Sequence, residues 1–340
     1  MTSSRPPTIK DVAALAGVSW KTVTNVVHER TNVAPDTRAR VLAAIAQLDY
    51  RTALPARQLR QGRTHTLTLV VPDVRNPYFS MLIEAVFAAA QVRGYAVFVE
   101  TAGRAPRDEE RAASSLLRFA FDGVIFSPTY TSPTELLRLA ARLPVVLLGE
   151  NTAGAGLDTV AIDNVAAARE ITEHLVTTGR RRIAFVGHRP DGAPEPGGVR
   201  VQGFTEALAA AGLAPAALVE ALVYDEAGGA AGVARLLADA PDVDGIVCAN
   251  DLLATGVLHG LRAAGRTVPG DVAVTGWDDI PVAAYLDPGI TTVAPDVPAL
   301  AGAAVDRVVA RVDGADGPWE QVVVPHRIVV RGSTTPGVSS

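Results

Sequence analysis

The stretch IKDVAALAGVSWKTVTNVV, residues 9–27, contains two short helical patterns separated by a glycine. Apolar residues recur at helical spacing in its first half, and Gly17 can then adopt the left-handed conformation that ends a helix. Ser19 is a good helix cap, and a stripe of valines follows it. The stretch therefore predicts two helices joined by a tight turn.

The flanking residues extend this unit to three helices. Thr8 can cap the first helix, with Asp11 three positions later as a weak capping box. Pro35 suits the first position of a third helix. The apolar stripe of that helix comprises Val41, Ile45 and Leu48. Three short helices with a glycine turn between the first two are typical of a helix-turn-helix unit.

Charge is distributed unevenly along the 340-residue chain, whose net charge is −5. Residues 1–63 contain ten Lys and Arg against four Asp and Glu, which gives this head a net charge of +6. The remaining residues therefore carry −11. A basic head on an acidic body indicates that the head binds a polyanion and the body does not.

The N-terminal face of the second predicted helix carries side chains suited to contacting DNA bases. Lys21 can donate to guanine, and Asn25 can form a bidentate pair with adenine. Trp20 follows the cap and lies off the valine stripe, so we expect it to be exposed and not in the core. Any one of these residues has an alternative role on the surface or in the core, but groove binding by the whole helix is favoured. The candidates are Ser19, Trp20, Lys21, Thr22 and Asn25.

Beyond residue 64 short apolar runs alternate with helical patterns. Runs such as TLTLVVPD (66–73) and RIAFVGH (182–188) are typical of strands buried on both faces. Two such series predict two similar subdomains, each a parallel sheet covered by helices. Ligands bind at the carboxyl ends of such strands. The polar residues expected there are Asp73, Ser127, Glu150, Asp163, Asp225, Asn250 and Asp278.

These polar residues have a competing role as helix caps. For Asp73, Asp163 and Asp251 capping is at least as well supported as ligand binding. For Asn250 and Asp278 ligand binding is favoured.

Three segments of the head resemble the lactose-repressor and purine-repressor (LacI/GalR) family, and the similarity continues through nearly the whole chain. The segments are TIKDVAALAGVSWKTVTNVVHE (8–29), VAPDTRARVLAAIAQLDY (33–50) and ALPARQLRQGRT (53–64). The resemblance implies that Trp20, Lys21 and Asn25 read bases in the major groove. It also implies that Leu59 wedges into the minor groove. Further DNA-contacting candidates are Thr8, His28 and Arg60.

The same resemblance implies a periplasmic-binding-protein-like core of two doubly wound lobes, with chain crossings near Asp163, Thr292 and Pro325. We therefore expect a helix-turn-helix domain over 1–50 and a hinge over 51–63. The effector-binding and dimerisation core would span 64–340. Its first lobe would comprise 64–163 and 293–324, and its second 164–292 and 325–340.

The family pattern also implies which core residues hold an effector. Tyr78 and Phe79, in the segment NPYF with Asn76, would stack on a sugar or base ring. Arg200 would grip the effector, and Asn250 and Asp278 would clamp it. Other candidates are Asp73, Ser127, Glu150 and Asp163. Gly149-Glu150 replaces the Asp-Arg of ribose-type binders, so a pentose is not supported.

The favoured hypothesis is a DNA-binding repressor switched by a small, sugar-like effector. A symmetric homodimer would bind a near-palindromic operator in double-stranded DNA. We see no signal peptide and no membrane-spanning run, and the single cysteine, Cys248, fits a reducing cytoplasm.

Two alternatives stay open. A solute-binding module for a transporter is disfavoured by the basic head and the missing signal peptide. A doubly wound enzyme is disfavoured because no G-x-G-x-x-G turn follows the first strand and no P-loop is found. The histidines show no metal-ligand spacing, so we expect neither a metal nor a cofactor.

Overall fold

The computed structural model describes residues 7–27, 33–50, 63–103, 105–149, 156–188, 196–221 and 223–335. The chain divides into two compact units, residues 1–64 and 65–340. Each unit is described by itself below.

The first unit contains the three predicted helices. They are α1 (Ile9–Ala16), α2 (Trp20–Val27) and α3 (Pro35–Gln47). The carboxylate of Asp11 accepts hydrogen bonds from the backbone N–H and the hydroxyl of Thr8, at 2.7 and 2.6 Å. Gly17 adopts a left-handed conformation (φ 65°), and the hydroxyl of Ser19 accepts the N–H of Thr22 at 3.1 Å. The local sequence signals therefore form the caps and turn that they predict.

A small apolar core joins these helices. Its fully buried members come from all three helices, which explains why the spacing of apolar residues predicted them. They are Val12, Ala13, Ala16, Val23, Val26, Val41 and Ala44.

The second unit consists of two lobes, each built on a six-stranded sheet. The strand orders are β11-β5-β4-β3-β1-β2 and β12-β10-β9-β8-β6-β7. All neighbours pair in parallel except β12, which is antiparallel to β10. The first sheet contains β1 (Thr66–Val71), β2 (Ala96–Thr101), β3 (Gly123–Phe126), β4 (Val145–Leu148), β5 (Asp158–Ile162) and β11 (Gln321–Val324). The second contains β6 (Ile183–His188), β7 (Ala217–Glu220), β8 (Gly245–Cys248), β9 (Ala273–Trp277), β10 (Thr291–Pro295) and β12 (His326–Val329).

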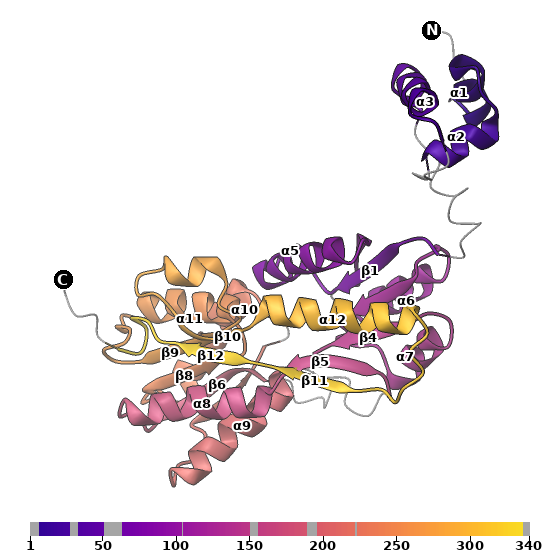
Figure 1. The fold of residues 1–340 in the computed structure, drawn as a ribbon. Helices are drawn as coiled ribbons and strands as arrows, with labels where there is room; N and C mark the ends of the chain where they lie inside the picture. The colour runs from indigo at the N-terminus through magenta and orange to yellow at the C-terminus, as the bar shows by residue number, and fades with distance from the viewer. Residues whose placement is uncertain are drawn as a thin grey trace. The chain divides into compact units, whose positions relative to one another are not determined.

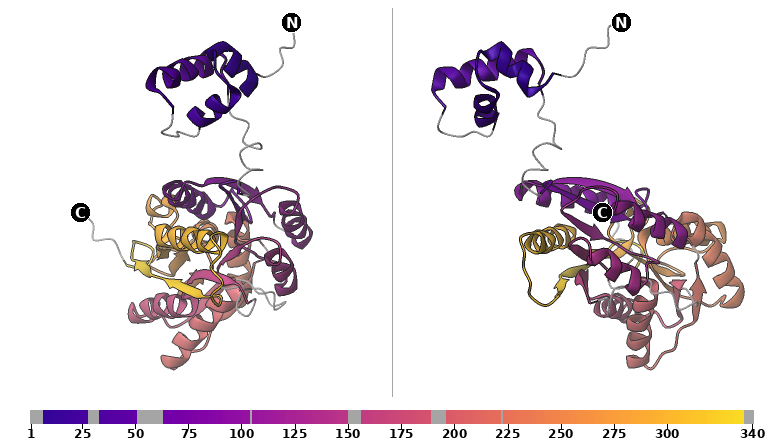
Figure 2. Two further views of the ribbon diagram at one scale, coloured as in Figure 1. Left: turned by 45° about the vertical axis from the view of Figure 1, so that its right-hand side comes forward. Right: turned by 90° about the vertical axis from the view of Figure 1, so that its right-hand side faces the viewer.

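Helices cover both faces of each sheet, as the alternating pattern predicts. In the first lobe α5 (Pro77–Val92) and α12 (Val297–Val312) lie side by side on one face (Figure 2), and α6 (Pro106–Leu116) and α7 (Pro133–Ala140) cover the other. In the second lobe α8 pairs with α9, and α10 with α11. Their bounds are α8 Asn164–Thr177, α9 Pro196–Ala210, α10 Glu226–Asp239 and α11 Asp251–Ala263; a short 3-10 helix, η1, spans Pro281–Ala284.

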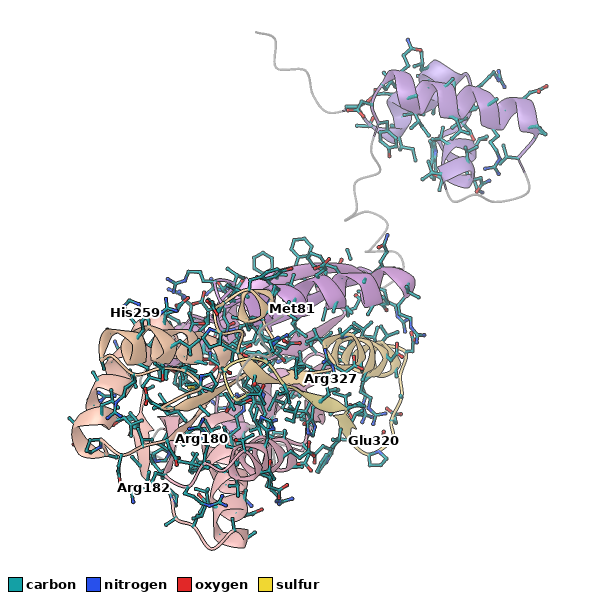
Figure 3. The ribbon with its side chains drawn as sticks, turned by 90° about the vertical axis from the view of Figure 1, so that its left-hand side faces the viewer. Met81, Arg180, Arg182, His259, Glu320 and Arg327 are labelled. Carbon is teal, nitrogen blue, oxygen red and sulfur yellow. The ribbon has the colours of Figure 1, made fainter. Side chains whose placement is uncertain are left out.

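The chain crosses three times between the lobes. The first crossing lies at Asp163, between β5 and α8, and the third at Pro325, between β11 and β12. Glu320 and Arg327, labelled in Figure 3, lie on the two sides of the third crossing, and Figure 1 shows these last strands in yellow. The middle crossing was predicted near Thr292, but it lies at Asp296, because β10 (Thr291–Pro295) first joins the second sheet.

The strands β11 and β12 were not predicted, because each is only four residues long and half-buried. Helix α6 begins at Pro106, which suits the first turn of a helix. Within the described ranges, none of the helices has the length and apolar character needed to cross a membrane.

Candidate functional sites

The N-terminal end of α2 projects a polar and aromatic surface. Trp20 is 51% exposed, and Ser19 and Lys21 are also exposed. Thr22 and Asn25 are half-buried on the same helix. The valines of α2 face the core of the head, so the remaining side chains are presented outward. The exposed tryptophan is as expected, because it lies off the buried stripe.

The other DNA-contacting candidates divide into two groups. Thr8 caps α1 through its contacts with Asp11 and is half-buried. His28, Leu59 and Arg60 lie outside the described residues.

A cavity of about 250 Å³ lies between the two lobes of the core. Its lining comes from both sheets, at the carboxyl ends of their strands, where parallel α/β folds bind ligands. Eight residues predicted from the sequence line it. They are Asp73, Asn76, Tyr78, Phe79, Ser127, Arg200, Asn250 and Asp278.

Three candidates are not placed in the cavity. Asp225 does not line it and instead caps α10, accepting the N–H of Gly228 at 2.9 Å. Asp163 does not line it; its carboxylate instead caps α8, accepting the N–H of Ala166 at 2.9 Å. The neighbouring residue Asn164 lines the cavity in its place. Glu150 lies outside the described residues, although Gly149 beside it is part of the lining.

Arg200 is the charged centre of the second lobe's wall. Its guanidinium carbon lies 4.0 Å from the ring centroid of Trp277, a cation–π contact with a ring that is 1% exposed. Nε of Arg200 donates to the side-chain oxygen of Asn164 at 2.9 Å, and Nη1 donates to the carbonyl of Ala249. Trp277, Asn164 and Ala249 contribute no opposite charge to these contacts.

Asn164 connects this arginine to the first crossing. Its side-chain nitrogen donates to the carbonyl of Ile162, on β5 of the first lobe, at 3.2 Å. Because Asn164 begins α8 of the second lobe, the chain Arg200–Asn164–Ile162 spans the crossing by hydrogen bonds. A change at Arg200 can therefore reach the segment about which the lobes would move.

Several polar lining residues also cap helices. Asn250 accepts the N–H of Leu253 at 2.8 Å and donates to the carbonyl of Tyr224 at 3.2 Å. Asn76 accepts the N–H of Tyr78 at 3.1 Å, and Asp73 pairs with Arg75 at 3.1 Å. Capping and lining thus coexist, because the same strand-to-helix turns that need caps form the rim of the cavity.

Asp278 lies in a constrained turn after β9. Its φ is 102° and that of Asp279 is 52°, which are unfavourable for residues with a side chain. Buried Asp251 holds this turn, because its carboxylate accepts the N–H of Ile280 at 2.9 Å and the hydroxyl of Thr292 at 2.7 Å. A Cβ added at Gly276 would lie 2.0 Å from that carboxylate, so glycine is required opposite it.

The sequence did not identify three lining residues with clear roles: Asn164, Tyr224 and Trp277. Tyr224 donates its hydroxyl to the carbonyl of Gly187 at 2.6 Å and borders the cavity. Trp277 directly precedes Asp278, and its position at the end of a strand beside that candidate was the available sequence signal. Asn164 follows Asp163, a good capping residue, so the sequence could not show that Asn164 makes a separate side-chain contact with Arg200.

A helix-turn-helix unit joined to a two-lobed core with a central cavity is the organisation of a ligand-responsive DNA-binding regulator. Comparison with known proteins agrees. Residues 8–53 match the profile of bacterial regulatory proteins of the lacI family, and residues 172–334 match a periplasmic binding protein-like domain.

Relatives match over the whole chain. The transcriptional regulator CelR of Thermobifida fusca is 34% identical, covering 98% of this chain and 100% of its own. The structure of a CelR–cellobiose complex matches with a TM-score of 0.71 and 32% identity, over 96% of this chain and 99% of the other. A lac repressor dimer bound to operator and the anti-inducer ONPF shares the fold, with a TM-score of 0.87 at 24% identity over 97% and 99%. The protein therefore belongs to the LacI family of bacterial transcriptional regulators.

Asp251 supplies a pH-dependent prediction. Burial raises the pKa of its carboxyl to about 7, against the lowering effect of the hydrogen bonds from Thr292 and Ile280. The unfolded chain has the ordinary value of about 3.9. The folded protein therefore holds an extra proton between these values, and its stability falls as pH rises through this window and then levels off. Asp251→Asn should abolish this fall, worth roughly 4 kcal/mol.

Chemical denaturation from pH 4.5 to 8 measures the effect. The free energy of unfolding of wild type should decline relative to Asp251→Asn as pH rises. Asp239→Asn, at the exposed end of α10, is the control and should parallel wild type. Parallel curves for wild type and Asp251→Asn would contradict the role assigned to burial.

Proposed function

We propose that the protein is a cytoplasmic repressor that binds, without turnover, a sugar between its lobes and thereby changes its affinity for an operator. The observation that carries the proposal is the set of eight sequence-derived residues gathered around one cavity. Membership of the LacI family supplies the link between such a cavity and DNA binding.

The exposed end of α2 supports the DNA-binding half of the proposal. We assign Trp20, Lys21 and Asn25 to base contacts in the major groove. Ser19 and Thr22 adjoin the N-terminus of α2, where backbone N–H groups and the helix dipole favour a phosphate. Thr8 and His28 would flank this contact, with Leu59 as a minor-groove wedge and Arg60 beside it.

The composition of the cavity supports a neutral sugar as effector. Aromatic faces of Tyr78 and Phe79 suit the apolar face of a sugar ring, whereas Arg200 and Asp278 can form charge-assisted hydrogen bonds with hydroxyls. The CelR relative has been crystallised with cellobiose, so a glucose disaccharide is the first candidate here. Asn76, Asp73, Ser127, Asn250 and, outside the described residues, Glu150 would complete the polar set.

Exposed apolar residues of the first lobe support a homodimer. They are Phe87 and Val92 on α5, Phe98 on the edge strand β2, and Phe119. Phe98 and Phe119 each lie 5.8 Å from the ring of Phe121, which forms an aromatic group at the sheet edge. A two-fold dimer would bury this surface and place two heads on a near-palindromic operator.

The first prediction concerns base recognition. Lys21→Ala should weaken binding to an operator selected from random duplexes by about 1–3 kcal/mol and relax one base position, because a base contact is lost. Fluorescence anisotropy with a panel of single-base variants measures both effects. Lys10→Ala is the matched control, since Lys10 is the only other lysine and lies on α1. It should leave the base preferences intact; unaltered preference in Lys21→Ala would refute the assignment of α2.

The second prediction concerns the effector. Trp277 is one of three tryptophans, so in a Trp20→Phe, Trp319→Phe background, used only for the cellobiose titration, its fluorescence should report cellobiose binding; DNA affinity is measured with Trp20 in place. Arg200→Ala should eliminate this signal and the effect of cellobiose on DNA affinity, while DNA affinity without sugar stays within about twofold. Arg235→Ala, an exposed arginine on α10, should behave as wild type. A normal cellobiose titration in Arg200→Ala would remove Arg200 from the site.

The third prediction concerns assembly. Phe98→Glu should convert the dimer to a monomer in sedimentation velocity experiments, because a buried charge would oppose association. Val323→Glu places the same change on β11, the opposite edge of the same sheet, and should leave the dimer intact. A dimeric Phe98→Glu variant would show that this surface is not the interface.

A further inference from the structure

One buried carboxylate holds the loop between β3 and α7. Glu109 on α6 is fully buried, and its carboxylate accepts the backbone N–H groups of Thr129, Tyr130 and Thr131 at 2.9–3.1 Å. The hydroxyl of Thr131 donates to the same carboxylate at 2.5 Å. All of these donors belong to three consecutive residues, 129–131.

Consecutive backbone N–H groups that converge on one point form a nest, which is an anion-binding conformation. Here a side chain of the protein itself is the anion. The next N–H along, that of Ser132, donates to Glu135 at 3.1 Å and begins α7. Four successive backbone donors are therefore bound to carboxylates, and the path of the loop is set by charge-assisted hydrogen bonds.

This loop is part of the effector cavity. Ser127, Thr129 and Tyr130 line it, whereas Glu109 does not. The same turn of α6 supports a second part of the wall, because a Cβ added at Gly103 would lie 2.6 Å from that of Asp108. The first turn of α6 thus lies behind two segments that face the cavity.

We propose that Glu109 is a positioning residue for effector binding: it acts as an internal anion that holds Thr129 and Tyr130 in the conformation that contacts the effector. The proposal rests on the proposed function, because it requires that an effector occupies this cavity. A residue that merely filled space in the core would be replaceable by a neutral isostere. Glu109 is not, because three backbone donors would lose a charged acceptor.

The affinity test uses the full chain and cellobiose. Glu109→Gln keeps the shape but turns an amide NH₂ toward backbone donors. We expect the cellobiose Kd, measured by Trp277 fluorescence, to rise tenfold or more, while DNA affinity without sugar changes less than twofold. Glu110→Gln, the exposed neighbour on α6, is the matched control. Wild-type affinity in Glu109→Gln would overturn the proposal.

Chemical rescue separates an anion requirement from a general structural role. In Glu109→Ala, added sodium formate can enter the vacated nest, whereas sodium chloride at equal ionic strength is a control. Formate should raise the melting temperature of Glu109→Ala and restore at least part of its cellobiose affinity, with no effect on wild type or Glu110→Ala. Absence of any formate-specific effect would overturn the proposal.

Hydrogen exchange of residues 129–131 provides a readout that needs no sugar. These amides should be protected in wild type, exchange faster in Glu109→Ala, and regain protection in formate. If Glu109→Ala does not fold, Glu109→Asp replaces it, and exchange as slow as in wild type with weakened cellobiose binding would overturn the proposal. If cellobiose fails to bind wild type, the proposed effector class is wrong, while formate and exchange still decide whether Glu109 organises the wall.

Discussion

The guanidinium of Arg200 is held against Trp277 while it hydrogen-bonds Asn164, and all three residues line the cavity between the lobes. The stacked ring fixes the plane of the guanidinium, and neutral partners leave its charge available to a ligand. Asn164 then bonds to Ile162 of the other lobe. The guanidinium of Arg200 is therefore connected by hydrogen bonds to the segment that joins the lobes. A ligand that contacts Arg200 can thus affect the geometry between the lobes.

Two buried acids support the walls on either side of this contact. In the second lobe Asp251 holds the turn that carries Asp278, through Ile280 and Thr292. In the first lobe Glu109 holds the loop that carries Tyr130. Each carboxyl group accepts backbone N–H hydrogen bonds from behind the cavity, three at Glu109 and one at Asp251, which keeps the lining side chains in place without occupying the ligand space. Preorganised walls reduce the conformational entropy that a ligand must overcome on binding.

Local signals explain which parts of the structure the sequence predicted. The caps at Thr8 and Ser19 and the turn at Gly17 depend on neighbours within a few residues, so they could be recognised directly. The edge of the cavity could be predicted because parallel strands end on one side. Contacts between distant segments could not be predicted. Asn164 and Arg200 are 36 positions apart in the sequence, and β10 pairs within the second sheet before the chain crosses to the first lobe. Asp163 was a candidate because it lies between a strand and a helix, and the same position makes it the cap of α8.

The central claim is that sugar and operator bind one chain with coupled free energies, and reciprocity tests it most directly. Anisotropy of a labelled operator, titrated with and without saturating cellobiose, gives the change in DNA affinity; fluorescence of Trp277 in a Trp319→Phe variant that keeps Trp20, titrated with cellobiose with and without saturating operator, gives the change in cellobiose affinity, and both titrations use this variant. The account predicts the same factor, fivefold or more, from both titrations. If cellobiose binds to saturation, as reported by Trp277 fluorescence, yet leaves operator affinity unchanged, the central claim is contradicted.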